Sequence, residues 1–181
     1  MKPLRLLIVV LMLPLLGGCY GVYSTRAVGE RPLVIDPEAW EGTWVHKDGA
    51  VTVAVTNPER GLLQLGWAEK KQGKLVFENY HVELRQTGQW IFGNVRDPGR
   101  PKLYAWARVV IDGNQIVLWV PDRARFEDMV RDNSIEGRVE KKGEDVILTG
   151  YGPEAVKRLM TSDGGIPLEY ERPLVFHRLS R

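Results

Sequence analysis

From Trp40 to the C-terminus, apolar side chains recur mostly at every second position. Val51, Val53 and Val55 alternate with threonine and alanine, which is typical of a strand with one buried face. The first strand opens at Gly42-Thr43-Trp44. Further strands are expected at 51–56, 63–67, 76–84, from 90 up to a turn at 97–99, and at 103–111, 116–120, 135–141, 145–149 and 174–179.

Short turn signals separate these segments. Gln72-Gly73, Thr87-Gly88 and Asp112-Gly113 are dipeptides typical of tight turns. Strands connected this closely pair with their sequence neighbours, which predicts a mainly β, antiparallel meander. A meander of about ten strands is expected to close into an up-and-down β-barrel, because closure removes exposed edges. A β-sandwich is the alternative. Glu78 interrupts the apolar face of 76–84, so we expect a bulge or a twist there.

Two short helices are expected late in the chain. Asp122 is a suitable N-cap, and Phe126, Met129 and Val130 follow with helical spacing. The charged residues of this helix suit a solvated face, or a helix that lies across the barrel mouth. The second helix begins near Pro153, which suits a first helical turn.

The beginning of the chain has a different pattern. Lys2 and Arg5 precede an uncharged run of 11 residues, Leu6–Leu16. This run is too short for a membrane-spanning helix, which needs about 20 apolar residues. It fits the apolar region of a secretory signal peptide, which is about 7 to 15 residues long.

Leu16-Gly17-Gly18-Cys19 follows this run and contains the only cysteine of the chain. The tetrapeptide resembles the lipobox of bacterial lipoproteins at all four positions. The resemblance implies that residues 1–18 are a signal peptide, that the chain is cut before Cys19, and that this cysteine carries the lipid anchor. Tyr20 stands where aspartate retains many such proteins in the inner membrane. The expected location is therefore the periplasmic face of a Gram-negative outer membrane.

Residues 19–39 are expected to form a lipidated tether, because they show no sustained period and are interrupted by Pro32 and Pro37. Residues 40–181 are expected to form a single β domain. Removal of residues 1–18 takes Lys2 and Arg5 from the 25 basic side chains, which leaves 23 against 23 acidic ones. This balance gives no reason to expect nucleic acid as a partner.

Gly42-Thr43-Trp44 resembles the Gly-x-Trp signature of lipocalins and related calycin barrels. The resemblance implies an up-and-down barrel whose open mouth takes small hydrophobic ligands. It also implies that Trp44 plugs the closed end and that a basic residue of the last strand, here Arg178, packs across its ring. Gly42, Trp44 and Arg178 would then be structural residues.

Six tryptophans are many for this length. The sequence alone favours their filling a barrel or sandwich core; the alternative is that several of them line an apolar ligand cavity, because ligand pockets are mostly hydrophobic. The candidate ligand-binding residues are Trp67, Trp90, Trp106 and Trp119.

Nothing in the sequence points to catalysis or to a cofactor. His46, His81 and His177 lie in separate strands without metal-binding spacing, and no nucleophile elbow, phosphate loop or dinucleotide motif is present. We therefore expect a non-enzymatic, membrane-anchored lipoprotein that binds a small hydrophobic or lipid ligand in the cell envelope. The alternative is a structural lipoprotein with a filled barrel that contacts other envelope proteins.

Overall fold

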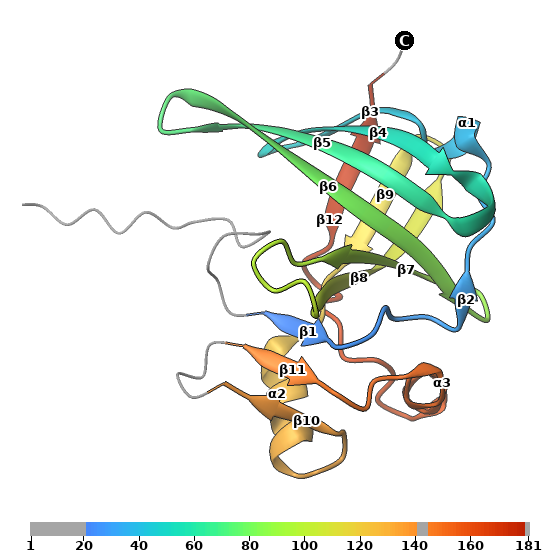
Figure 1. Ribbon diagram of the computed structural model, residues 1–181, viewed down its shortest axis with the longest axis vertical. Coiled ribbons are helices and arrows are strands. Elements are labelled where there is room, and N and C mark those ends of the chain that lie inside the picture. The colour runs from blue at the N-terminus through green and yellow to red at the C-terminus, as the bar shows by residue number, and fades with distance from the viewer. Residues whose placement is uncertain (1–20, 141–144, 180–181) are drawn as a thin grey trace, which may run out of the picture.

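The computed structural model describes residues 21–140 and 145–179, and its central feature is a closed antiparallel β-barrel (Figure 1). Consecutive strands of the barrel pair with one another. The ring is completed where β8 (Tyr104–Asp112) pairs with β9 (Gln115–Trp119) and where β12 (Leu174–Arg178) pairs with β3 (Gly42–His46). The expected up-and-down barrel is confirmed, and the sandwich alternative is excluded. The barrel strands are β3 (Gly42–His46), β4 (Gly49–Asn57), β5 (Leu62–Lys71), β6 (Lys74–Thr87), β7 (Trp90–Arg96), β8 (Tyr104–Asp112), β9 (Gln115–Trp119) and β12 (Leu174–Arg178).

The alternating pattern explains the barrel core. Side chains of one parity on each strand point inward, because successive strand residues face opposite sides of a sheet. Trp44, Leu63, Leu84 and Phe176 are buried there, together with valines of β4 and β8. The helix α1 (Pro37–Trp40) packs against the end of the barrel that contains Trp44 and adds Trp40 to the same core.

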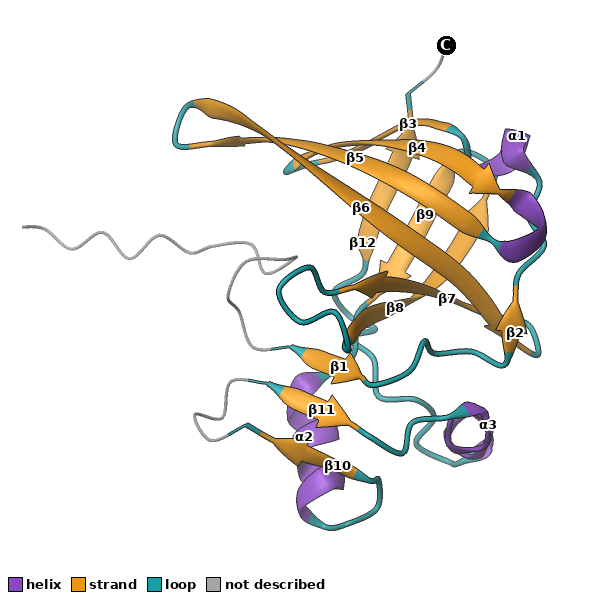
Figure 2. Ribbon diagram, in the orientation of Figure 1, coloured by secondary structure: helices purple, strands orange, loops and turns teal. Residues whose placement is uncertain are grey.

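A second small sheet lies beside the barrel, in the lower part of Figure 2. It contains β1 (Val22–Ser24), β10 (Gly137–Val139) and β11 (Val146–Leu148), and β1 joins it to β8 through the pair Tyr23 and Ala105. Its partners α2 (Arg123–Arg131) and α3 (Pro153–Thr161) correspond to the two expected late helices. A further short strand, β2 (Arg31–Pro32), pairs with β6.

The insertion between β9 and β12 builds a second apolar core outside the barrel wall. Phe126 of α2, Val156 of α3 and Tyr151 pack there against Phe92 and Trp106, which point outward from β7 and β8. The helix α2 packs on β10 and β11, so it does not lie across the barrel mouth (Figure 1). Both faces of the β7–β8 wall are therefore buried in apolar cores.

The N-terminal segment expected as a tether differs from that expectation from residue 21 onward. Val22, Val28 and Ile35 are buried, and β1 and β2 are paired strands. Asn94 of β7 holds the segment in place, since its side chain accepts a hydrogen bond from Val28 N–H at 2.6 Å and donates to Val28 C=O at 3.0 Å. These contacts are long-range in sequence, so local periodicity does not reveal them. Cys19 and the signal segment lie outside the described residues.

Candidate functional site

Trp44 and Arg178 lie at the closed end of the barrel. The indole Nε1 of Trp44 donates to the C=O of Trp40 at 3.0 Å, and the Arg178 guanidinium carbon lies 4.4 Å from the centre of a Trp44 ring. Arg178 also donates to the C=O of Glu38 at 3.0 Å and to that of Ala39. Gly42 begins β3 with φ +129°, a conformation that favours glycine. This end of the barrel is therefore closed by packed and hydrogen-bonded side chains.

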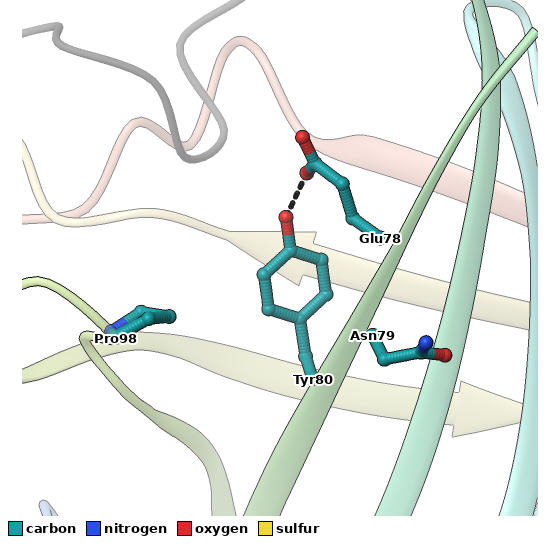
Figure 3. Close-up of a pocket in the computed structure, with 4 residues that line it drawn as sticks. All are labelled: Glu78, Asn79, Tyr80 and Pro98. Carbon is teal, nitrogen blue, oxygen red and sulfur yellow. Dashed lines mark hydrogen bonds between the residues drawn. The ribbon is translucent and has the colours of Figure 1, made fainter.

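The opposite end of the barrel is open and contains a hollow of about 350 Å³. It is lined by Glu78, Asn79 and Tyr80 of β6 and by Pro98 of the β7–β8 loop (Figure 3). The hollow lies where β6 loses its partner, because pairing with β7 begins only at Val82. Glu78 and Tyr80 point into it from the same side of the strand, as Figure 3 shows.

The sequence predicted a bulge or a twist at Glu78, and the bulge is absent. The pairing of β5 with β6 runs from Leu62–Glu83 to Lys71–Lys74 without a shift in register, so there is no bulge at Glu78. The carboxylate instead lies on the inner face at the barrel mouth, where water reaches it. The interruption of the apolar pattern was the signal for this site, and it indicated a polar lip instead of a bulge.

The lip of the hollow is a small polar network. The hydroxyl of Tyr80 donates a hydrogen bond to the Glu78 carboxylate, drawn in Figure 3. Burial and this carboxylate raise the pKa of Tyr80, so its hydroxyl stays protonated and remains a donor. Lys71 pairs with Glu69 at 2.5 Å and lies 4.0 Å from Glu78. The lip thus presents a hydroxyl, two carboxylates and an ammonium group.

The inner face of the barrel next to Glu78 is aromatic and apolar, because Trp67 lies opposite Glu78 on β5. Trp67 and Phe176 meet edge to face at 6.3 Å, and the His46 ring lies 5.1 Å from Phe176. Burial lowers the pKa of His46, so the neutral ring accepts a hydrogen bond from Asp48 N–H at its Nδ1 atom, 3.3 Å away. Trp67 is only half-buried although it faces inward.

Small residues occupy the facing part of the wall. Gly93 points toward Leu84 and Val109 of the barrel core, and Ala105 and Ala107 share the inward face with Val109. Both alanines are half-buried. A Cβ added at Gly93 would lie 3.2 Å from Val109, so this glycine allows close packing of the barrel core, while the two alanines keep the inner face of β8 narrow.

The structure separates the four candidate tryptophans into two groups. Trp67 lies inside the barrel, whereas Trp106 and the partly buried Trp90 and Trp119 belong to the outer core. The Arg108 guanidinium carbon lies between two of them, 3.9 Å from the Trp90 ring centre and 5.2 Å from that of Trp119. Only Trp67 is therefore positioned to contact a molecule at the mouth. The sequence could not assign these faces, because both sides of the wall are apolar.

The remaining candidate chemistry is dispersed. His81 and His177 are exposed on β6 and β12, and His46 faces the barrel interior. In the part of the chain that the structure describes, no group of three or more histidine, cysteine, aspartate or glutamate side chains could hold a metal ion. None of the helices among residues 21–140 and 145–179 is long and apolar enough to cross a membrane.

Comparisons with known proteins place the chain in no group: no family model matches it, and neither the curated proteins nor the solved structures contain a match.

Proposed function

We propose that this protein is a bacterial lipoprotein with a lipocalin-like barrel, anchored to the cell envelope through Cys19, and that it binds a small hydrophobic or lipid ligand at its barrel mouth. The hollow of about 350 Å³ between β6 and Pro98 carries the proposal. Its volume falls within the range of about 300 to 1,000 Å³ typical of small-molecule sites.

The chemistry of the mouth suits an amphipathic ligand. An apolar tail could lie against Trp67 and the small wall residues Ala105 and Ala107, where burial of apolar surface provides affinity. A polar head would meet the lip, where Tyr80 donates a hydrogen bond and Lys71 carries a positive charge. An apolar wall beside a polar lip favours a lipid over a fully polar metabolite as the ligand.

Binding and release of such a ligand need no covalent chemistry, so the proposal does not include an enzymatic activity or a cofactor. The anchor at Cys19 would keep the barrel beside the membrane, at the periplasmic face of a Gram-negative outer membrane, which is the source of a lipid ligand.

Purification under native conditions tests the ligand proposal. Native mass spectrometry beside an organic extraction should detect a bound lipid, and tryptophan fluorescence should change when fatty acids or phospholipids are added to the emptied protein. An empty protein that ignores all of them would contradict the proposal and favour the interaction module with a filled barrel.

Two matched pairs of variants localise the ligand. Trp67→Phe should abolish the fluorescence response, whereas Trp90→Phe should retain it, because both rings are half-buried but only Trp67 faces the barrel interior. Ala105→Leu should weaken binding about tenfold by filling the mouth, whereas Ala54→Leu on the exposed face of β4 should not. The reverse result in either pair would place the ligand elsewhere.

The anchor is tested separately. The mature wild-type protein should have the mass of a chain that begins at Cys19 and carries acyl chains, and Cys19→Ser should incorporate no radiolabelled fatty acid. Label incorporation by the serine variant would contradict the lipobox interpretation without affecting the ligand experiment.

A further inference from the structure

The turn between β5 and β6 reaches beyond every neighbouring strand at the open end of the barrel (Figure 2). Pairing of β5 with β4 ends at Glu69, and pairing of β6 with β7 ends at Val82. At about 3.3 Å per strand residue, Leu75 stands roughly 23 Å beyond Val82 along β6. We call residues 70–77 the hairpin tip.

The hairpin tip exposes two large apolar side chains on one face. Leu75 is 68% exposed and Phe77 is 72% exposed, and their spacing of two residues puts both on the outer face of β6. Ala68 lies opposite Phe77 on β5 and continues the apolar surface. The other exposed large apolar side chains of the described residues lie singly on other segments: Val34, Tyr170 and Leu179.

The same tip is positively charged. It contains Lys70, Lys71 and Lys74 and no acidic residue. The nearest carboxylates, Glu69 and Glu78, lie at its base, where Glu69 pairs with Lys71 at 2.5 Å. Exposed apolar side chains flanked by lysines are the composition of surfaces that enter the interface of an anionic bilayer.

Contacts connect the start of the described chain to the loop that lines the hollow opposite the base of this hairpin. Gly21 N–H donates to Asp145 at 2.8 Å, and Asp145 pairs with Arg100 at 2.6 Å. Arg100 also pairs with Asp97 at 2.9 Å, next to the Pro98 that lines the hollow with Glu78 and Tyr80. Figure 1 shows the start of β1 and the hairpin tip on the same side of the molecule.

We infer that the hairpin tip is a membrane-docking element that inserts Leu75 and Phe77 into an anionic lipid leaflet while its lysines contact the headgroups. The inference goes beyond ligand binding, and it rests on the proposed lipid anchor only for the membrane to which the tip is delivered. Gly21 lies two residues after Cys19, so the anchor and the tip would approach one bilayer from the same side of the molecule. Docking in this orientation turns the hollow at the barrel mouth toward the lipid.

The test uses the mature, lipidated protein in vesicles of phosphatidylethanolamine and phosphatidylglycerol. Because the thiol of Cys19 carries the lipid, Leu75→Cys supplies a single site for an environment-sensitive dye. Val34→Cys is the matched control, since Val34 is 73% exposed and lies on another segment, near α1. Lipids with a quencher in the acyl chain should quench the dye at position 75 about threefold more strongly than at position 34.

A charge variant tests the role of the lysines. Each lysine near an anionic leaflet contributes about fivefold to membrane affinity. Lys70→Glu combined with Lys74→Glu should therefore lower quenching at position 75 to the level of position 34, and wild-type protein in pure phosphatidylcholine should show the same loss. The control pair is Arg60→Glu, which precedes the start of β5 at the other end of that strand, and Arg125→Glu, which is exposed on α2. This pair should leave quenching unchanged.

Equal quenching at the two positions in anionic vesicles would overturn the inference. So would shielding of the position 75 dye in vesicle-free detergent solution together with a dimer mass, because the tip would then contact a second copy of the chain. Failure of the anchor is read independently from the mass of the mature protein. If the anchor is absent, docking is tested by flotation of the Cys19→Ser protein with phosphatidylglycerol vesicles. The protein should float, and adding Leu75→Ser and Phe77→Ser should abolish its flotation; a protein that does not float would overturn the inference.

Discussion

Arg178 connects three elements at the closed end of the barrel. Its guanidinium lies over Trp44 of β3 and donates to two carbonyl groups of α1. Each hydrogen bond from a charged group contributes about 1.5 to 3 kcal/mol, and a cation–π contact contributes about 0.5 to 2 kcal/mol. Arg178 therefore connects Trp44 and α1, which close this end of the barrel, to the last strand, β12.

We expect Arg178→Ala to lower the free energy of unfolding by about 2 to 4 kcal/mol, measured by urea denaturation. Arg172→Ala is the control, because Arg172 is exposed and its ion pair with Glu169 is a surface contact. That control should change stability by less than about 0.5 kcal/mol. Equal losses in both variants would show that the contacts to Trp44 and α1 do not stabilise the barrel.

His46 makes the stability of the barrel depend on pH. Burial lowers its pKa below the ordinary value of 6.5, so the unfolded chain binds a proton that the folded chain rejects. The free energy of unfolding should therefore fall as the pH drops below 6.5, and His46→Gln should reduce this fall. His177→Gln, at an exposed position, should retain it. A fall of the same size in His46→Gln would assign the pH dependence to other groups.

At the scale of elements, the N-terminal segment behaves as part of the barrel wall. β1 and β9 use the same edge of β8, with β9 paired from Arg108 to Asp112 and β1 at Tyr104 and Ala105. Asn94 supplies the connection, because its buried amide pairs with both backbone groups of Val28. One polar side chain thus holds a segment that has few regular strand pairs of its own.

Asn94→Ala should lower the free energy of unfolding by about 2 to 4 kcal/mol, because it leaves the buried N–H and C=O of Val28 without partners. Hydrogen exchange should show the earliest loss of protection at residues 21–35. Asn79→Ala, at an exposed position of β6, is the matched control and should have little effect. Unchanged protection of the N-terminal segment in Asn94→Ala would contradict this assignment.

At the scale of the whole molecule, the two apolar cores share the β7–β8 wall. Ile91 and Val109 face the barrel core, whereas Phe92 and Trp106 face the outer core built by the insertion. Phe126 of α2 meets the Trp106 ring edge to face at 5.8 Å and is fully buried. We therefore expect the barrel and the insertion to unfold as one cooperative unit.

Phe126→Ala should lower stability by about 3 to 5 kcal/mol, because it leaves a cavity in the outer core. Circular dichroism and tryptophan fluorescence should report the same single transition, shifted to lower temperature. Val34→Ala, at an exposed position, should leave the transition in place. Two separate transitions in the phenylalanine variant would show that the insertion unfolds independently of the barrel.

The sequence by itself determined the local elements and the class of fold. Alternation of apolar residues located the strands, turn dipeptides located their connections, and Asp122 located the start of α2, where its side chain accepts from Arg125 N–H at 3.1 Å. These features depend on neighbours within a few residues, so local chemistry is enough to predict them. The interpretation of Cys19 as a lipidation site also depends on local sequence and remains a prediction.

Tertiary structure alone decided which face of each strand is inside and where the mouth lies. On β8 the alternation places Trp106 and Arg108 on one face and Ala107 and Val109 on the other. Because both faces pack against other side chains, the pattern does not indicate which face lies inside the barrel. The pairing of Val28 with Asn94, and the position of Glu78 and Pro98 around one hollow, bring together segments that are distant in sequence. Such contacts form because closing the barrel brings these segments together, which no local period in the chain encodes.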